Sequence, residues 1–190
     1  MSAMNRYSAL IDACVLGGAL KRNIILSLAE AGLFRPRWSD RILDETEKSI
    51  ATISKGTSNT ARQRAAIEKA FPEATVPLGA DINVTGMLPD PNDEHVLQAA
   101  IWARCETLVT DNLSDFPQDV LDLWSIEVMS ADVFISNAVD LDHVVAIEAM
   151  REMRARLRDP KYSVSALVLK LESQGLLHTA DFFRRYENLI

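Results

Sequence analysis

Acidic side chains stand at the borders of predicted strands and helices in four separate segments, at Asp12, Glu45, Asp93 and Asp115. In a parallel α/β sheet, ligands gather at the carboxyl ends of the strands, so these acids are expected to meet at one edge. Carboxylates packed together are unfavourable unless they are protonated or neutralised by a cation. Hard oxygen ligands favour Mg²⁺ or Mn²⁺. The pattern therefore predicts a divalent metal site.

The segment PDPNDEHVLQAA (89–100) concentrates acidic side chains at the start of one predicted helix. Asp90 suits the N-cap and Pro91 the first helical position, while Asp93 faces the positive end of the helix dipole. Capping and metal binding are both open for Asp93. His95 has no partner motif, which favours a packed or exposed helix histidine over a ligand.

Each remaining acid also has a structural alternative. Asp12 lies within the apolar segment YSALIDACVL, and a carboxylate buried there needs a reason, which favours function. Glu45 belongs to DETEK, which by itself is typical of a solvated helix face. Asp111, Asn112 and Asp115 lie in the loop DNLSDFP, where turn formation is the competing explanation.

The elements that must position these acids alternate between strands and helices. Strands are predicted at 7–16, 106–110 and 124–130, and helices at 17–32, 37–54, 61–71 and 94–105. This alternation indicates an α/β domain with a mainly parallel sheet. The helix at 37–54 is expected to have Ser39 as its N-cap, and its inner side is expected to contain Ile42, Leu43, Ile50 and Ile53. Within the region before the fourth helix, Val84 is assigned to a short strand. From about residue 131 onward no clear strand is found, and helices are predicted at 142–157, 164–175 and 179–190.

Composition limits the classes of function. The chain has 190 residues and a formal net charge of −7, so its overall field does not favour general binding of polyanions. Neither a secretory signal nor an apolar run of membrane-spanning length is visible. Cys14 and Cys105 form no metal-type spacing, which favours a reducing, cytoplasmic location. A Walker loop, a dinucleotide-binding glycine loop and a Ser-His-Asp order are not found.

The order of the acidic motifs resembles that of a PIN domain, and most closely the bacterial branch that includes the VapC-type toxins. The resemblance rests on LIDACVL, WSDRILDE, DPNDEHVLQAA and TDNLSDFP. It implies an α/β fold, a PIN-like domain with a central mainly parallel sheet flanked by helices, over 1–135. A C-terminal helical extension over 136–190 is similar to that of some of these toxins.

This resemblance implies a metal-dependent ribonuclease that is the toxin of a bacterial type II toxin–antitoxin system. It implies that the acids in these motifs hold Mg²⁺ or Mn²⁺ and act in hydrolysis of RNA: Asp12, Glu45, Asp93 and Asp115. The implied partners are an RNA substrate and a cognate antitoxin protein, and the formation of a homodimer is left open. Many family members have Ser or Thr soon after the first aspartate, whereas this chain has Ala13 and Cys14.

Two other functions are considered. A phosphotransferase with Asp12 as nucleophile needs a second acid two residues later, where Cys14 stands. A catalytically inactive PIN-like scaffold, serving as a protein- or RNA-binding module, has no reason to retain mutually repelling carboxylates.

The last motif offers two candidates for the fourth metal ligand. Asp111 directly follows the strand, whereas Asp115 precedes Phe116 and Pro117, which are expected to anchor and restrict the loop. The NLxDF pattern of the family also favours Asp115. Asp111 and Asn112 are then supporting residues, with Asn112 as a hydrogen-bonding helper.

Two basic clusters are candidates for contact with RNA. Arg35, Arg37 and Trp38 combine positive charge with a stacking surface just before the helix that carries Glu45. A second cluster shares one helix face at i, i+3, i+7 spacing: Arg151, Arg154 and Arg158. For both clusters the alternative is a solvated face paired with nearby acids.

Overall fold

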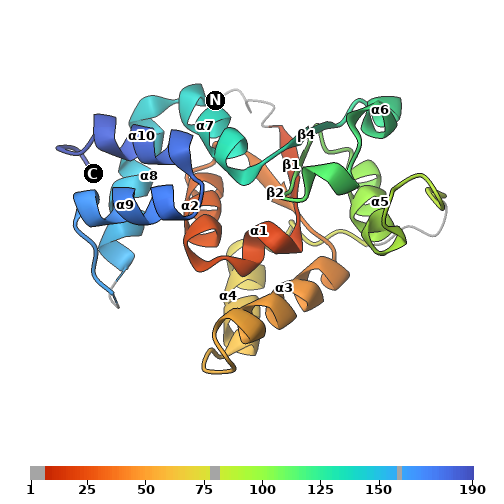
Figure 1. The fold of residues 1–190 in the computed structure, drawn as a ribbon, viewed down its shortest axis with the longest axis horizontal. Coiled ribbons are helices and arrows are strands. Elements are labelled where there is room, and N and C mark those ends of the chain that lie inside the picture. Colours follow the sequence, from red (N-terminus) through yellow and green to blue (C-terminus); the bar gives the residue numbers. More distant parts are fainter. Residues whose placement is uncertain (1–6, 78–81, 158–159) are drawn as a thin grey trace. The chain divides into compact units, whose positions relative to one another are not determined.

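The computed structural model describes residues 7–77, 82–157 and 160–190. They form two compact units (Figure 1). The first contains 7–19 and Arg35–Ser130, and the second contains Leu20–Phe34 and Ala131–Ile190. The sequence assigned 20–34 to the nuclease domain and ended that domain at 135. In the structure, 20–34 is instead grouped with the C-terminal helices.

A four-stranded parallel sheet organises the first unit, with strand order β2-β1-β3-β4. The strands are β1 (Ser8–Ile11), β2 (Arg35–Arg37), β3 (Thr107–Val109) and β4 (Glu127–Met129). Apart from Ser8, every residue of β1 and β3 is buried, as expected for central strands covered on both faces. The predicted α/β class with a parallel sheet is confirmed.

Strand β1 is shorter than predicted, because Asp12 begins a helix. Its carboxylate accepts a hydrogen bond of 2.6 Å from the amide of Ala13, at the start of α1 (Ala13–Gly17). Helix α1 lies against α3 (Asp40–Ile53) at Gly17. A β-carbon on Gly17 would stand 2.2 Å from Ser49 Oγ, so glycine permits this close approach.

Helix α3 has the predicted N-cap and most of the predicted inner side. Ser39 Oγ accepts a 3.2 Å hydrogen bond from the amide of Ile42. Ile42, Leu43 and Ile50 are buried, but Ile53 is exposed at the end of the helix, so its predicted inward position is wrong.

Arg64 on α4 (Thr60–Ala70) ties this helix to α3. Its guanidinium pairs with carboxylates on both helices: Asp40, Asp44 and Glu47 on α3 and Glu68 on α4. These ion pairs raise the pKa of Arg64 further above its usual range, although burial opposes the shift. The acids of this face of α3 are therefore neutralised within the α3–α4 pair.

The segments around the sheet edge are short. Asp90 accepts a 2.9 Å hydrogen bond from the amide of Asn92 at the start of the 3₁₀ turn η1 (Pro91–Asp93), which leads into α5 (Glu94–Trp102). After β3 come η2 (Leu113–Asp115), α6 (Gln118–Leu121) and η3 (Asp122–Trp124). Val84 is fully buried but lies in irregular structure, so its predicted strand is wrong.

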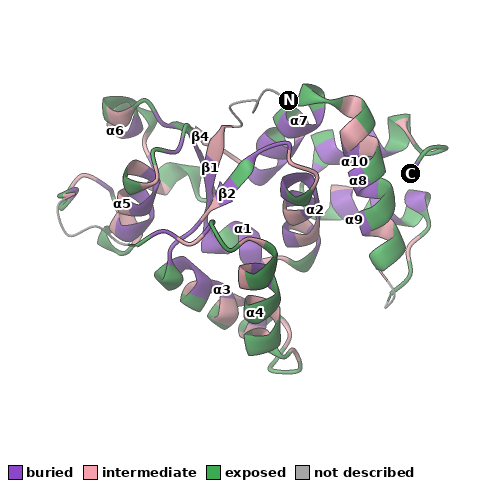
Figure 2. Cartoon of the chain, turned by 180° about the vertical axis from the view of Figure 1, so that it is seen from behind, coloured by how far each residue is buried: buried purple, intermediate pink, exposed green. Residues whose placement is uncertain are grey.

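Helices make up the second unit: α2 (Ala19–Glu30, all but its first residue), α7 (Ala131–Leu141), α8 (His143–Arg156), α9 (Val164–Ser173) and α10 (Leu177–Arg185). The sequence predicted the last three, and α7 was missed. On α9 one side is buried and the other exposed (Figure 2). Phe34 and Phe134 meet edge to face in the core of this unit, with ring centroids 4.8 Å apart.

Asp132 on α7 holds the start of α10. Its carboxylate accepts hydrogen bonds from the amide of His178 (2.9 Å) and from the amide and hydroxyl of Thr179 (2.9 and 2.8 Å). Since α10 has no cap of its own, Asp132 satisfies its first amides from another helix. Throughout the described parts of the chain, every helix falls short of the length and apolarity that crossing a bilayer requires.

Candidate metal and catalytic site

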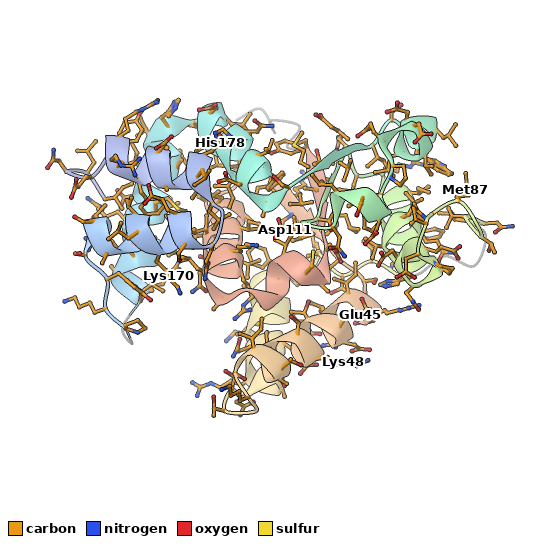
Figure 3. All side chains as sticks on the ribbon, viewed as in Figure 1. Glu45, Lys48, Met87, Asp111, Lys170 and His178 are labelled. Carbon is orange, nitrogen blue, oxygen red and sulfur yellow. The ribbon has the colours of Figure 1, made fainter. Side chains whose placement is uncertain are left out.

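The predicted acids of the first unit gather around the carboxyl ends of the strands. Asp12 directly follows β1, and its amide donates a 3.0 Å hydrogen bond to the carbonyl of Val109, the last residue of β3. Asp111 and Asp115 belong to the loop that leaves β3, whereas Glu45 is presented by α3 (Figure 3). The topology thus brings segments from distant parts of the sequence to one edge.

Asp12 is buried and firmly oriented. Oδ2 accepts hydrogen bonds from the hydroxyl of Thr110 (2.8 Å) and the thiol of Cys14 (3.0 Å), and Oδ1 accepts the amide of Ala13. These donors hold the carboxylate group in one rotamer. The sequence alone did not identify Thr110 as a site residue, because its role depends on pairing between β1 and β3.

Cys14 stands where many family members were expected to have a hydroxyl, and it donates to Asp12 in the same way a hydroxyl would. Desolvation of the sulfur, followed by the nearby charge of Asp12, raises the pKa of the thiol to about 12. The thiol therefore stays protonated at neutral pH and remains a hydrogen-bond donor.

Asp93 differs from its neighbours in the PDPNDEH segment because it makes no capping hydrogen bond. Asp90 caps η1, and Glu94 Oε1 accepts the amide of Gly86 at 2.7 Å. Burial, followed by the negative charges of nearby carboxylates, raises the pKa of Asp93 to about 6; these neighbours are Asp12, Asp90, Asp115 and Glu45. Asp90 therefore caps this segment, whereas Asp93 lies near the other carboxylates.

Glu45 lies between two basic side chains. Its Oε1 is 3.2 Å from Arg41 Nε and 3.1 Å from His95 Nε2. His95 is only 4 % exposed, and burial lowers the pKa of its ring, which favours the neutral form despite the opposing charge of Glu45. Glu45 is half-buried, so it is not the fully solvated residue that DETEK suggested.

Around the last motif, the structure separates the two candidate ligands. Asp111 is exposed, and its amide donates to Cys14 Sγ at 3.3 Å. Asp115 is half-buried beside the anchored Phe116, which is 1 % exposed, and its charge contributes to the raised pKa of Asp93. The exposed Asn112 begins η2 without a side-chain cap bond. Of the two candidates, Asp115 and not Asp111 contributes to the raised pKa of Asp93, which favours Asp115 as the fourth ligand.

Comparison with known proteins gives a family for this arrangement. The family model described as PIN domain matches residues 8–114. The chain belongs to the PIN domain family. A second model, described as VapC50 C-terminal domain, matches residues 131–185, which begin at α7.

A relative in Mycobacterium tuberculosis (strain ATCC 25618 / H37Rv), named "Putative ribonuclease VapC50", is 33 % identical over 82 residues. The match covers 43 % of this chain and 48 % of the relative, so it spans about half the length of that protein. No solved structure matches. Three of the four predicted PIN-domain acids lie inside the family match, and Asp115 lies one residue beyond it.

The donor set of this PIN domain suits a hard divalent cation. No group of three or more His, Cys, Asp or Glu side chains among the described residues is already close enough to hold a metal. However, after burial, the charges of nearby carboxylates are the next causes that raise the pKa of Asp93, so a cation in their midst would relieve repulsion. Oxygen donors of this kind fit Mg²⁺ or Mn²⁺.

The predicted basic contacts are not gathered with the acids. Trp38 is fully buried and its Nε1 donates to Thr75 Oγ1 at 3.2 Å, so the predicted stacking surface is wrong. Arg37 donates to the carbonyl of Glu73. Arg35 pairs in register with Ser8, at the amino end of the sheet, about 13 Å along the strand from Asp12.

The second basic cluster has structural partners. Arg154 donates to the carbonyls of Ile190 (3.0 Å) and Tyr162 (3.3 Å), whereas Arg151 pairs with Glu148. Arg158 lies outside the described residues. Pairing within the protein therefore describes Arg151 and Arg154 better than the predicted contact with RNA.

Proposed function

We propose that this PIN domain is a Mg²⁺- or Mn²⁺-dependent ribonuclease that hydrolyses RNA phosphodiester bonds. The observation that carries the proposal is that Asp93 is partly buried near carboxylates from three other segments, Asp12 after β1, Glu45 on α3 and Asp115 in η2, and that its pKa is raised to about 6. A relative with a matching segment is named a ribonuclease. Both observations point to hydrolysis rather than to an inert scaffold.

In this proposal Asp12, Glu45, Asp93 and Asp115 hold the cation, with Asp111 and Asn112 at the rim. When bound, the metal would lower the pKa of a water and withdraw charge from the phosphoryl oxygens. Asp12 is the best fixed of these ligands, because Thr110 and Cys14 hold its Oδ2. A bound cation would also attract phosphate to a protein whose net charge is −7.

The biological role that fits best is that of a VapC-type toxin acting in the cytoplasm and controlled by an antitoxin protein. The support is the pair of matches to PIN and VapC50 C-terminal models. An antitoxin arginine would suit clustered carboxylates, because a guanidinium binds them bidentately. Co-expression with the product of the adjacent gene should relieve toxicity, and toxicity that persists would count against this role.

The ribonuclease proposal is tested by cleavage of a labelled RNA over a Mn²⁺ titration. Asp12→Asn keeps an oxygen for the Ala13 amide, so the fold should persist while the charge is lost. Glu127→Gln is the matched control, since Glu127 is exposed and starts β4 at the amino end of the sheet. We expect cleavage that a chelator and Asp12→Asn abolish and Glu127→Gln leaves intact. Cleavage insensitive to chelator would refute the proposal.

A further inference from the structure

His95 is a buried polar residue whose ring nitrogens have no hydrogen bond. Nε2 lies 3.1 Å from Glu45 Oε1, but the ring N–H does not point along that line well enough to form a bond. Nδ1 also lacks a partner among the described residues. A polar ring that is 4 % exposed is strongly unfavourable without a hydrogen bond, and Glu45 offers the adjacent acceptor.

The two basic neighbours of Glu45 approach the same oxygen. Arg41 Nε donates to Oε1 at 3.2 Å, and His95 Nε2 is also closest to Oε1. Among the described residues, no donor bonds to Oε2. One carboxylate oxygen is thus held by the protein, while the other keeps its lone pairs for a ligand.

Arg41 also joins the helix of Glu45 to the segment of Asp93. Its second terminal nitrogen donates to the carbonyl of Asn92 at 3.3 Å. Since Asn92 precedes Asp93 and His95 follows it by two residues, contacts from one short segment reach both Glu45 and Arg41. These contacts fix the spacing between Glu45 and Asp93.

We propose that His95 is a positioning residue: a small reorientation of its ring, across the 3.1 Å that separates Nε2 from Glu45 Oε1, lets Nε2–H donate to Oε1 and, with Arg41, leaves Oε2 free for the metal. This inference rests on the proposed function, because the orientation of Glu45 affects metal binding only if Glu45 is a metal ligand. Groups that hold a metal ligand in this way commonly change metal affinity or activity about 10- to 100-fold when they are lost.

Two substitutions separate hydrogen bonding from packing. His95→Gln keeps an N–H donor near the position of Nε2, whereas His95→Leu keeps apolar volume and removes the donor. Each is made in the wild type and in Glu45→Ala, and the Kd for Mn²⁺ is measured by calorimetry. Melting curves identify any variant that fails to fold, and the other variant then carries the comparison.

We expect His95→Leu to weaken Mn²⁺ binding about 10-fold or more, and His95→Gln to restore most of that loss. In the Glu45→Ala background, His95→Leu should have little further effect, because the residue acts through Glu45. Equal losses in both backgrounds would overturn the proposal. So would direct nitrogen coupling of His95 to bound Mn²⁺ in pulsed electron paramagnetic resonance, which would make His95 a ligand.

A measurement without metal distinguishes this inference from the proposed function. In ¹⁵N-labelled protein, the imidazole of His95 should be neutral and protonated on Nε2, and Glu45→Ala should shift that resonance. A proton on Nδ1 would overturn the inference. If the wild type binds no Mn²⁺, the proposed function fails, and the imidazole spectrum still decides whether His95 bonds to Glu45.

Discussion

Asp132 in the second unit and Asp93 in the first are both aspartates beside a helix start, but their surroundings are opposite. Asp132 is 9 % exposed and accepts three hydrogen bonds from the beginning of α10. Asp93 makes no capping hydrogen bond, and burial, followed by the charges of other carboxylates, raises its pKa to about 6. Donors surround the first side chain, whereas negative charges surround the second.

The difference teaches that acidity at a helix start does not by itself mark a functional site. Asp132 and Asp90 are satisfied by backbone amides, so their charge stabilises local structure. Asp93 has neighbours that only a proton or a cation can balance. The nature of the nearest partners therefore separates a structural aspartate from a candidate ligand.

The largest expected effect is a loss of cleavage activity on substitution in the last acidic motif, the loop DNLSDFP. At saturating Mn²⁺ we expect Asp115→Asn to lower kcat/KM about 100-fold or more, because a proposed ligand of the metal that stabilises the transition-state charge is lost. Asp111→Asn should lose less, since Asp111 is exposed. Cleavage rates of both purified variants on one RNA check this. An inactive Asp111→Asn beside a nearly normal Asp115→Asn would reverse the assignment.

Removal of the structural aspartate should act on stability instead. Asp132→Ala leaves the donors at His178 and Thr179 without their acceptor, which should cost about 3 kcal/mol. Circular dichroism in urea measures the loss of helix. The three tryptophans, Trp38, Trp102 and Trp124, all lie in the first unit, so their fluorescence is the control. A shift below about 1 kcal/mol, the contribution of one ordinary hydrogen bond, would contradict the capping role.

Substitution of Asp93 should change the stability of the metal-free protein in the opposite direction to substitution of Asp132. The folded-state pKa of about 6 lies above the ordinary aspartate pKa of 3.8, so the folded state binds this proton more tightly. Stability from Asp93 is therefore present at low pH and is lost as pH rises through the folded-state pKa. After a discount for solvent screening, Asp93→Asn should stabilise the metal-free protein by about 1 kcal/mol at neutral pH.

Urea unfolding followed by tryptophan fluorescence between pH 4 and 8, roughly spanning both pKa values, measures this difference. The advantage of Asp93→Asn should grow with pH and then level off. Excess Mn²⁺ should cancel it, because the cation stabilises only the wild-type site by mass action. A pH-independent difference would show that Asp93 is not repelled by its neighbours.

The smallest effect is expected at Cys14. Cys14→Ser replaces the thiol by a hydroxyl that donates to Asp12 Oδ2 in the same way, so activity should stay within about threefold of wild type. Cys14→Ala removes the donor but leaves Thr110 on the same oxygen, and should lose somewhat more. Cleavage rates and Mn²⁺ titrations of the pair check this order. If Cys14→Ser is less active than Cys14→Ala, the thiol has a role other than donating a hydrogen bond to Asp12.

The sequence predicted the features that depend on local pattern. Alternating strands and helices indicated the parallel sheet, the apolar setting of Asp12 marked it as unusual, and Ser39 was found as a cap. Each of these signals lies within a few neighbouring residues. Local chemistry was enough to recognise them.

Features that depend on contacts between distant segments were missed or wrong. His95 and Glu45 are 50 positions apart in the sequence, so nothing local paired them. Trp38 follows two arginines that suggested an exposed basic strip, yet its ring is in the core. The end of β1 was misplaced because the apolar run ALIDACVL continues through the strand and into α1.

The close approach of α1 and α3 has a consequence for how this sequence can change over generations. Asp12 begins α1 and Glu45 belongs to α3, so the packing of Gly17 on Ser49 sets the spacing between two of the proposed ligands. A β-carbon at position 17 would also stand 2.9 Å from Ser49 Cβ, which rotation of the serine cannot relieve. Descendants of this chain should therefore accept a larger residue at 17 only when 49 becomes glycine, and the two positions should vary as a pair.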